Sequence, residues 1–189
     1  MPKARWAIFI SGRGSNANSV LQSGQHKICL AFSSKAGAAG NSRFKRAGVP
    51  LVILPKAIDW MAVQRQLQKY RITHIFLLGF MKLIPGDFLK HWERRIFNIH
   101  PSLLPAYPGL RSFERSYQDH ANVGVTVHHV ITEMDAGERI FQKKILDKQD
   151  QRWPDQKQAQ LLLSAAEQRL VQRTFDKISN REFRCKSMN

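Results

Sequence analysis

The chain has 189 residues, 43% of them hydrophobic, which suits one domain with a sizeable core. Its 30 Lys and Arg residues against 14 Asp and Glu give a net charge of +16. The apolar runs are of strand length, and no secretory signal or membrane span is recognisable. Cys29 and Cys185 form neither a disulfide framework nor a metal-binding spacing. We therefore expect a cytoplasmic protein that contacts no membrane and binds no metal.

Strand-length apolar runs alternate with segments of helical pattern along most of the chain. In chain order, the pattern predicts strands at 6–10, 27–32, 51–54, 74–78, 95–99, 123–130 and 140–145. Helices are predicted at 16–21, 41–47, 59–70 with Asp59 as N-cap, 87–92, and 155–178. The last helix carries Leu161, Leu162, Ala165, Leu170 and Phe175 at partly amphipathic spacing. This alternation indicates an α/β fold with a Rossmann-like, open, mostly parallel twisted sheet of about seven strands, flanked by helices.

The loop after the first predicted strand is rich in glycine, with the sequence Ser11-Gly12-Arg13-Gly14-Ser15-Asn16. Glycines let a backbone approach an anion closely, and a helix N-terminus supplies free N–H groups. The loop matches neither the dinucleotide fingerprint nor the P-loop. Two interpretations remain at this point: a phosphate cradle, or a tight turn capped by Ser15 or Asn16.

The segment from 77 to 85 reads Leu-Leu-Gly-Phe-Met-Lys-Leu-Ile-Pro and follows the fourth predicted strand. A glycine leads it into an apolar loop that ends at Pro85. Such a segment can line a pocket for a flat aromatic ligand, because its backbone hydrogen bonds while its side chains give an apolar wall. Ordinary core packing is the alternative interpretation.

Two polar side chains end the fifth predicted strand. Asn98 and His100 are at positions i and i+2, so they share one face of the strand, and Pro101 helps to end it. Asparagine offers an amide donor for a developing oxyanion, and histidine can carry a proton near neutral pH. Because open α/β sheets keep their chemistry at strand ends, the pair predicts an acyl-transfer site.

A second strand with histidines leads into an acidic loop. Val125, Val127 and His129 alternate with Thr126, His128 and Val130, and Asp135 follows in the loop. An aspartate close to His100 would favour the imidazolium and raise the pKa of that histidine. We interpret His128 and His129 as structural.

The first 58 residues contain nine Lys or Arg and no Asp or Glu. Such a face would attract a phosphorylated small molecule, a polyglutamylated cofactor or nucleic acid. The alternative is a solvated surface on a basic protein. Because the basic residues are scattered and no exposed aromatics lie between them, we expect no nucleic-acid partner.

Taken together, these motifs resemble the phosphoribosylglycinamide formyltransferase family, within the wider group of folate-dependent formyltransferases. The resemblance covers residues 8–145, and its most specific motif is Asn98-Ile99-His100-Pro101-Ser102-Leu103-Leu104-Pro105. It implies one formyltransferase domain over 1–189, with a nucleotide- and phosphate-binding half at 1–96 and a catalytic and folate-binding half at 97–189. It also implies a cis peptide before Pro105.

The family's roles carry over by position. The resemblance implies a catalytic set of Asn98, His100 and Asp135, and a ribonucleotide site of Gly14, Ser15, Asn16 and Glu167. The implied folate contacts are Met81, Lys82, Leu83, Ile84, Asn98, Val130, Ile131, Thr132 and Glu133. The implied cosubstrate is 10-formyltetrahydrofolate, the formyl donor, and no metal is required.

The implied function is formyl transfer from 10-formyltetrahydrofolate to the amine of glycinamide ribonucleotide in purine biosynthesis, by a monomer or homodimer. Departures from the family pattern around Arg111 and Glu167 keep other acceptors open. One alternative is a related enzyme that uses aminoacyl-tRNA, a sugar amine or water as acceptor. The other is a non-catalytic basic domain that binds nucleic acid.

Overall fold

The computed structural model describes residues 4–150 and 152–184, so Cys185 lies outside the described residues. In chain order the elements are β1 (Trp6–Ile10), α1 (Ser15–Ser23), β2 (Ile28–Ser33), α2 (Asn41–Arg46), β3 (Leu51–Ile53), α3 (Trp60–Lys69), β4 (His74–Leu77), α4 (Gly86–Lys90), β5 (Ile96–His100), α5 (Ser112–Gln118), β6 (Val123–His129), β7 (Arg139–Leu146) and α6 (Gln156–Arg184). All seven predicted strands are present, and no bound shifts by more than one residue. The Asp59 side chain accepts a hydrogen bond from the Ala62 N–H, which confirms its prediction as an N-cap.

The strands form one sheet in the order β3-β2-β1-β4-β5-β6-β7. The five strands β3, β2, β1, β4 and β5 pair in parallel, whereas β6 and β7 add antiparallel at one edge. The predicted α/β fold with a mostly parallel sheet is therefore confirmed. Each parallel step uses a helical crossover, as βαβ units require.

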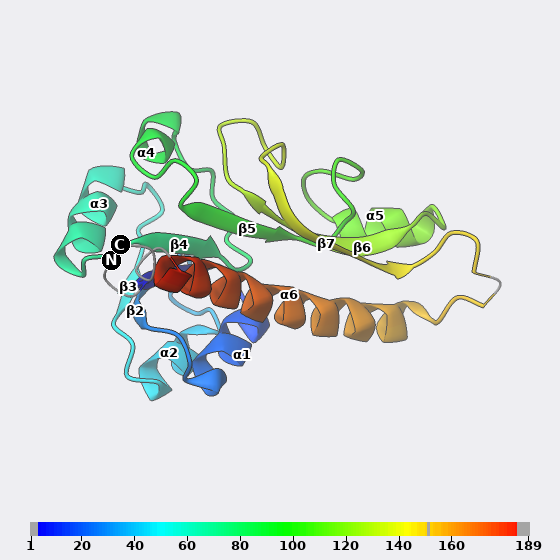
Figure 1. Cartoon of the computed structure of the whole chain (residues 1–189), viewed down its shortest axis with the longest axis horizontal. Helices are drawn as coiled ribbons and strands as arrows, with labels where there is room; N and C mark the ends of the chain where they lie inside the picture. Colours follow the sequence, from blue (N-terminus) through cyan, green and yellow to red (C-terminus); the bar gives the residue numbers. More distant parts are fainter. Residues whose placement is uncertain (1–3, 151, 185–189) are drawn as a thin grey trace.

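Helices cover both faces of the sheet (Figure 1), and an apolar cluster lies between the helices and the sheet on each face. Helices α1, α2, α5 and α6 contribute buried residues to one cluster, in which Trp6, Phe76, Phe97 and Phe175 lie together. Helices α3 and α4 cover the opposite face. Because both faces of the central strands are covered, β1 is buried along its whole length.

Two helical predictions were incomplete or wrong. The seven-residue helix α5 was missed, because its N-cap Arg111 makes no side-chain cap hydrogen bond and two of its three buried residues are serines. In α6, Leu161 and Leu162 are 64% and 49% exposed, so they do not face the core as their spacing suggested. Ala165 is exposed too, whereas Leu170 and Phe175 lie in the core as predicted, together with Ala159, Leu163, Ala166 and Val171.

The strand order reverses direction between β1 and β4. From β1 the chain moves outward to β2 and β3, and it then returns to β4 and continues to β5 on the other side. Loops that leave β1 and β4 diverge here, and such a switch point is where open α/β sheets bind ligands. No helix in the described part of the chain is long and apolar enough to cross a membrane.

Candidate active site

The last residues of β5 face β6 and the loops beyond the sheet. Asn98 pairs with His128 and His100 with Thr126 across the antiparallel β5–β6 ladder. The predicted faces are confirmed, because Thr126 and His128 lie on the same side as Asn98 and His100. Thr126 donates to the Ser102 carbonyl and accepts from the Leu104 N–H, which holds the chain reversal after β5. The peptide between Leu104 and Pro105 is cis, as the resemblance implied.

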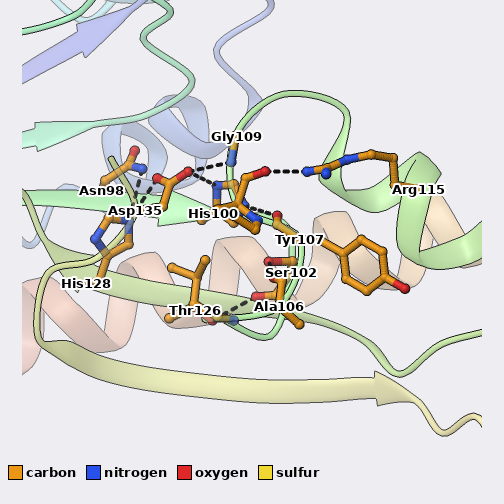
Figure 2. A network of polar contacts seen from close by, with 12 residues as sticks. Asn98, His100, Ser102, Ala106, Tyr107, Gly109, Arg115, Thr126, His128 and Asp135 are labelled. Atoms are coloured by element: carbon orange, nitrogen blue, oxygen red, sulfur yellow. Dashed lines mark hydrogen bonds and ion pairs between the residues drawn. The ribbon is translucent and has the colours of Figure 1, made fainter. Parts of the chain in front are cut away.

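Asp135 reaches this strand end from the loop after β6 (Figure 2). Its Oδ2 lies 3.4 Å from Nδ1 of His100 and accepts a 2.8 Å hydrogen bond from the Gly109 N–H. Its Oδ1 lies 3.5 Å from Nε2 of His128. Burial opposes ionisation of Asp135, but the hydrogen bonds from His128 and Gly109 and the charge on His100 outweigh it and lower the pKa of the carboxyl.

Both ring nitrogens of His100 face acceptors. Nδ1 faces Asp135, and Nε2 lies 2.9 Å from the Tyr107 carbonyl oxygen, so only the imidazolium can donate to both. Burial nevertheless lowers the pKa of His100 below its ordinary value, although Tyr107 and Asp135 act in the raising direction. The expectation of a raised pKa was therefore wrong, because desolvation of the charged ring exceeds the effect of Asp135.

His128 belongs to the same cluster, although its pattern suggested a merely structural residue. Its Nδ1 donates to the His129 carbonyl at 2.8 Å, and its Nε2 lies 3.2 Å from the Asn98 amide nitrogen. A neutral His128 accepts from that amide and orients it, whereas a protonated His128 donates to Asp135. The sequence pattern placed His128 on the same strand face as Thr126, but it could not place His128 opposite Asn98. That position follows from the β5–β6 register.

The glycine-rich loop connects β1 to α1 at the switch point. Gly14 is the N-cap of α1 with φ 67°, and a Cβ there would lie 3.1 Å from the Gly40 Cα. No side chain caps this helix, so its first N–H groups are not taken by Ser15 or Asn16. This favours the anion-binding interpretation of the loop over the capped turn.

Asn16 and Glu167 meet across the fold, although 151 residues separate them in the chain. The Asn16 amide donates to Oε2 of Glu167 at 3.1 Å. Burial raises the pKa of the Glu167 carboxyl, and the hydrogen bond from Asn16 opposes this only in part. Oδ1 of Asn16 is buried without a hydrogen-bond partner among the described residues, so it is available to a donor from a ligand.

A cavity of about 620 Å³ joins these groups. Five of its lining side chains are large, apolar and exposed, namely Met81, Leu83, Leu110, Ile131 and Met134. Exposed apolar side chains that gather around a hollow indicate a ligand site. Ser11, at the start of the glycine-rich loop, connects this loop to the segment that follows β4. Its Oγ accepts from the Met81 N–H at 2.9 Å, and its N–H donates to the Gly79 carbonyl.

The lining brings together all but one of the residues named from the sequence. It includes Gly14, Ser15, Asn16, Met81, Lys82, Leu83, Ile84, Asn98, His100, Val130, Ile131, Thr132, Asp135 and Glu167. Glu133 is the exception, because it is exposed and lies outside the lining. Met134 also lies in the lining, within the range 130–135 that the resemblance assigned to the loop around the pterin, whereas Gly109 and Arg111 were not named as cavity residues. Within residues 4–150 and 152–184, no group of three or more His, Cys, Asp or Glu side chains could hold a metal ion.

Asn98 and His100 at the end of the parallel strand β5, together with Asp135 from the loop after β6 and the glycine-rich loop before α1, form an arrangement that suits acyl transfer. A family model described as formyl transferase matches residues 4–162. The chain belongs to this formyl transferase family.

The relatives include phosphoribosylglycinamide formyltransferases. The enzyme of that name from Haemophilus influenzae is 35% identical over 151 residues, which cover 74% of this chain and 71% of the relative. A trifunctional purine biosynthetic protein adenosine-3 from Gallus gallus is 36% identical over 155 residues, but this chain spans only 16% of its length. The crystal structure of phosphoribosylglycinamide formyltransferase from Anaplasma phagocytophilum superposes with a TM-score of 0.87 at 29% identity, covering 95% of this chain and 89% of that one.

Proposed function

We propose that this protein transfers the formyl group of 10-formyltetrahydrofolate to the amine of glycinamide ribonucleotide, a step of purine biosynthesis, in the cytoplasm. The observation that carries the proposal is one cavity that contains both the Asn98–His100–Asp135 cluster and the Gly14 loop. The first suits formyl chemistry, and the second suits a phosphorylated acceptor. The names of the relatives agree with this combination.

The proposed chemistry is direct transfer. The amine nitrogen forms a bond to the formyl carbon, and negative charge develops on the formyl oxygen. Asn98 donates a hydrogen bond to this oxyanion and the positive charge of protonated His100 stabilises it, while Asp135 holds His100 and favours its charged form. The intermediate collapses when the bond to the folate nitrogen breaks. The proton lost by the amine passes to that nitrogen, and no metal takes part.

The acceptor side of the cavity suits a ribonucleotide phosphate. Gly14 and Ser15 present the uncapped N-terminus of α1, and the Arg13 side chain makes no ion pair among the described residues. A phosphate here would gain backbone hydrogen bonds and the positive end of the helix dipole. Glu167 and the unpartnered Oδ1 of Asn16 would accept hydrogen bonds from the hydroxyl groups or amine of the same ligand.

The donor side of the cavity is apolar. Met81 to Ile84 and Val130 to Thr132 both line it. A flat pterin between these segments would bury apolar area, and the backbone of both segments would hydrogen bond to its ring edges. The loop after β6, which includes Val130 to Thr132, also carries Asp135, so folate binding and the orientation of His100 depend on one segment.

The proposal is tested by incubating the protein with 10-formyltetrahydrofolate, with and without glycinamide ribonucleotide, and following the appearance of tetrahydrofolate. We expect release that depends on the acceptor. Release without the acceptor would support a formyl-folate hydrolase instead, and no release would contradict a catalytic role. A parallel reaction with aminoacylated tRNA tests the alternative acceptor.

Glu167→Gln should separate stability from binding. The pKa of the Glu167 carboxyl is higher in the folded protein than in the unfolded chain. The protonated carboxyl therefore favours folding at a pH below its pKa in the unfolded chain, and this contribution is lost as the pH rises through its pKa in the folded protein. Glutamine keeps an acceptor for Asn16 without the buried charge. We therefore expect a higher Tm than the wild type at pH 8, with a smaller difference at pH 5.

The same variant should bind the ribonucleotide less tightly. Loss of a charged hydrogen-bond partner predicts a KM for glycinamide ribonucleotide raised about tenfold, with the KM for the folate unchanged. Thermal melts at the two pH values and steady-state kinetics check both statements. An unchanged ribonucleotide KM would remove Glu167 from the acceptor site.

A further inference from the structure

The turn from Tyr107 to Arg111 contacts both members of the His100–Asp135 pair, one from each side. The Tyr107 carbonyl lies 2.9 Å from Nε2 of His100, and the Gly109 N–H donates to Oδ2 of Asp135 at 2.8 Å. Both contacts use backbone atoms, so the path of this turn decides whether they are made. Figure 2 shows the turn passing beside His100 on its way to α5.

This turn adopts a conformation that its residues do not favour. Tyr107, Gly109 and Arg111 have φ values of 55°, 78° and 55°, and the two non-glycine residues are in the left-handed region that side chains with a Cβ rarely adopt. A backbone of this kind persists only where its surroundings hold it in place. The contacts that hold it therefore also hold His100 and Asp135.

Side chains from α5 and its C-cap supply these contacts. The Tyr107 hydroxyl donates to Oδ2 of Asp119 at 2.9 Å. The Arg115 guanidinium donates to the Pro108 carbonyl and lies over the Tyr107 ring, 5.7 Å from its centroid. Arg115 and Asp119 thus fix both the side chain of Tyr107 and the peptide that follows it.

We propose that Tyr107, Arg115 and Asp119 form a clamp that positions His100, by keeping the Tyr107 carbonyl on Nε2 while Asp135 remains on Nδ1. With both ring nitrogens facing acceptors, the ring is held in one orientation and donates from both sides when charged. The three residues are positioning residues, since none of them reaches the reacting atoms. The clamp rests on the proposed function only for its effect on turnover.

Tyr107→Phe is the cleanest probe, because it removes the bond to Asp119 and leaves every charge in place. The charged and titratable groups that face His100 are Asp135 from the loop after β6, His128 from β6 and Arg115 from α5. None of them changes in this variant. Tyr117→Phe is the matched control. Tyr117 lies on α5, and this variant removes the 2.9 Å hydrogen bond from its hydroxyl to the Pro154 carbonyl, away from His100.

The first readout is nitrogen NMR of the His100 ring in the ligand-free protein, which reports its tautomer and its titration without any substrate. The Tyr107 carbonyl favours the charged ring, so loosening it should lower the pKa of His100 further. We expect the proton affinity of His100 to fall about three- to tenfold in Tyr107→Phe and in Asp119→Asn, and to stay at the wild-type value in Tyr117→Phe.

The second readout is the pH profile of kcat. Because the charged ring is the active form, the alkaline limb should move to lower pH in Tyr107→Phe and Asp119→Asn, with both KM values unchanged. Wild-type NMR titration and tautomer in both variants would overturn the clamp, even if their Tm falls. Absence of formyl transfer by the wild type would contradict the proposed function instead, and the NMR comparison would still decide the clamp.

Discussion

Asn98→Ala is expected to lower kcat by about a hundredfold to a thousandfold. The loss of one donor to a developing oxyanion typically costs about 2.7 to 4 kcal/mol. Asn98 is half-buried at the cavity, and one of its amide hydrogens faces Nε2 of His128. The other is therefore free for the formyl oxygen. Single-turnover kinetics with saturating 10-formyltetrahydrofolate and glycinamide ribonucleotide measure the effect on the chemical step.

His100→Ala should cause a similar or larger loss in the same assay, because it removes the positive charge that stabilises the oxyanion beside Asp135. His91→Ala is a suitable control, since His91 is exposed at the end of α4 and lies outside the cavity lining. Near-normal turnover in either site variant, with a folded protein by circular dichroism, would contradict the assignment of the catalytic cluster.

Gly137→Ala is expected to disturb both stability and catalysis. A Cβ at this position would lie 1.8 Å from the His129 carbonyl oxygen, which is backbone and cannot turn aside. Gly137 follows Asp135 by two residues and lies just before β7, next to the register shift between Val127 and His128. We expect a free energy of unfolding lower by about 1 to 3 kcal/mol, the usual cost of overpacking.

The same substitution should lower kcat by about a hundredfold, because a displacement of about 1 Å in a reacting group has an effect of this size. Gly37→Ala is the matched control, since a Cβ there meets nothing within 4 Å and its φ is not positive. Denaturant titrations and kinetics of the two variants give the comparison. Equal stability and activity in Gly137→Ala would show that the loop carrying Asp135 adapts freely.

Electrostatics illustrate where local reasoning failed. From the sequence, an aspartate near His100 predicts a raised pKa, since opposite charges favour the imidazolium. In the fold, the ring is also buried and faces His128 and Arg115, and desolvation has the largest effect. Attraction by a single partner can be guessed from residue types, but the loss of solvent depends on every element that packs around the ring.

Residues that act through distant partners were also beyond sequence reasoning. His128 was interpreted as structural because alternation assigns only a face, and its position opposite Asn98 follows from strand register. Helix α5 was missed because a seven-residue segment with buried serines has little amphipathic signal. Its side chains Arg115 and Asp119 hold the turn that contacts His100, and this relation exists only in three dimensions.

Local patterns were sufficient for the seven strands, the mostly parallel sheet, the Asn98 and His100 pair on one strand face and the glycine-rich loop after β1. Each of these depends on side-chain periodicity or backbone freedom within a few residues, which the sequence states directly. The resemblance grouped Asp135 with His100 and Asn16 with Glu167, but only the tertiary structure shows the contacts within each group, and it alone revealed that the Tyr107 turn contacts both His100 and Asp135. These contacts join segments up to 151 residues apart, so they depend on the order of the strands and the packing of the helices rather than on local pattern.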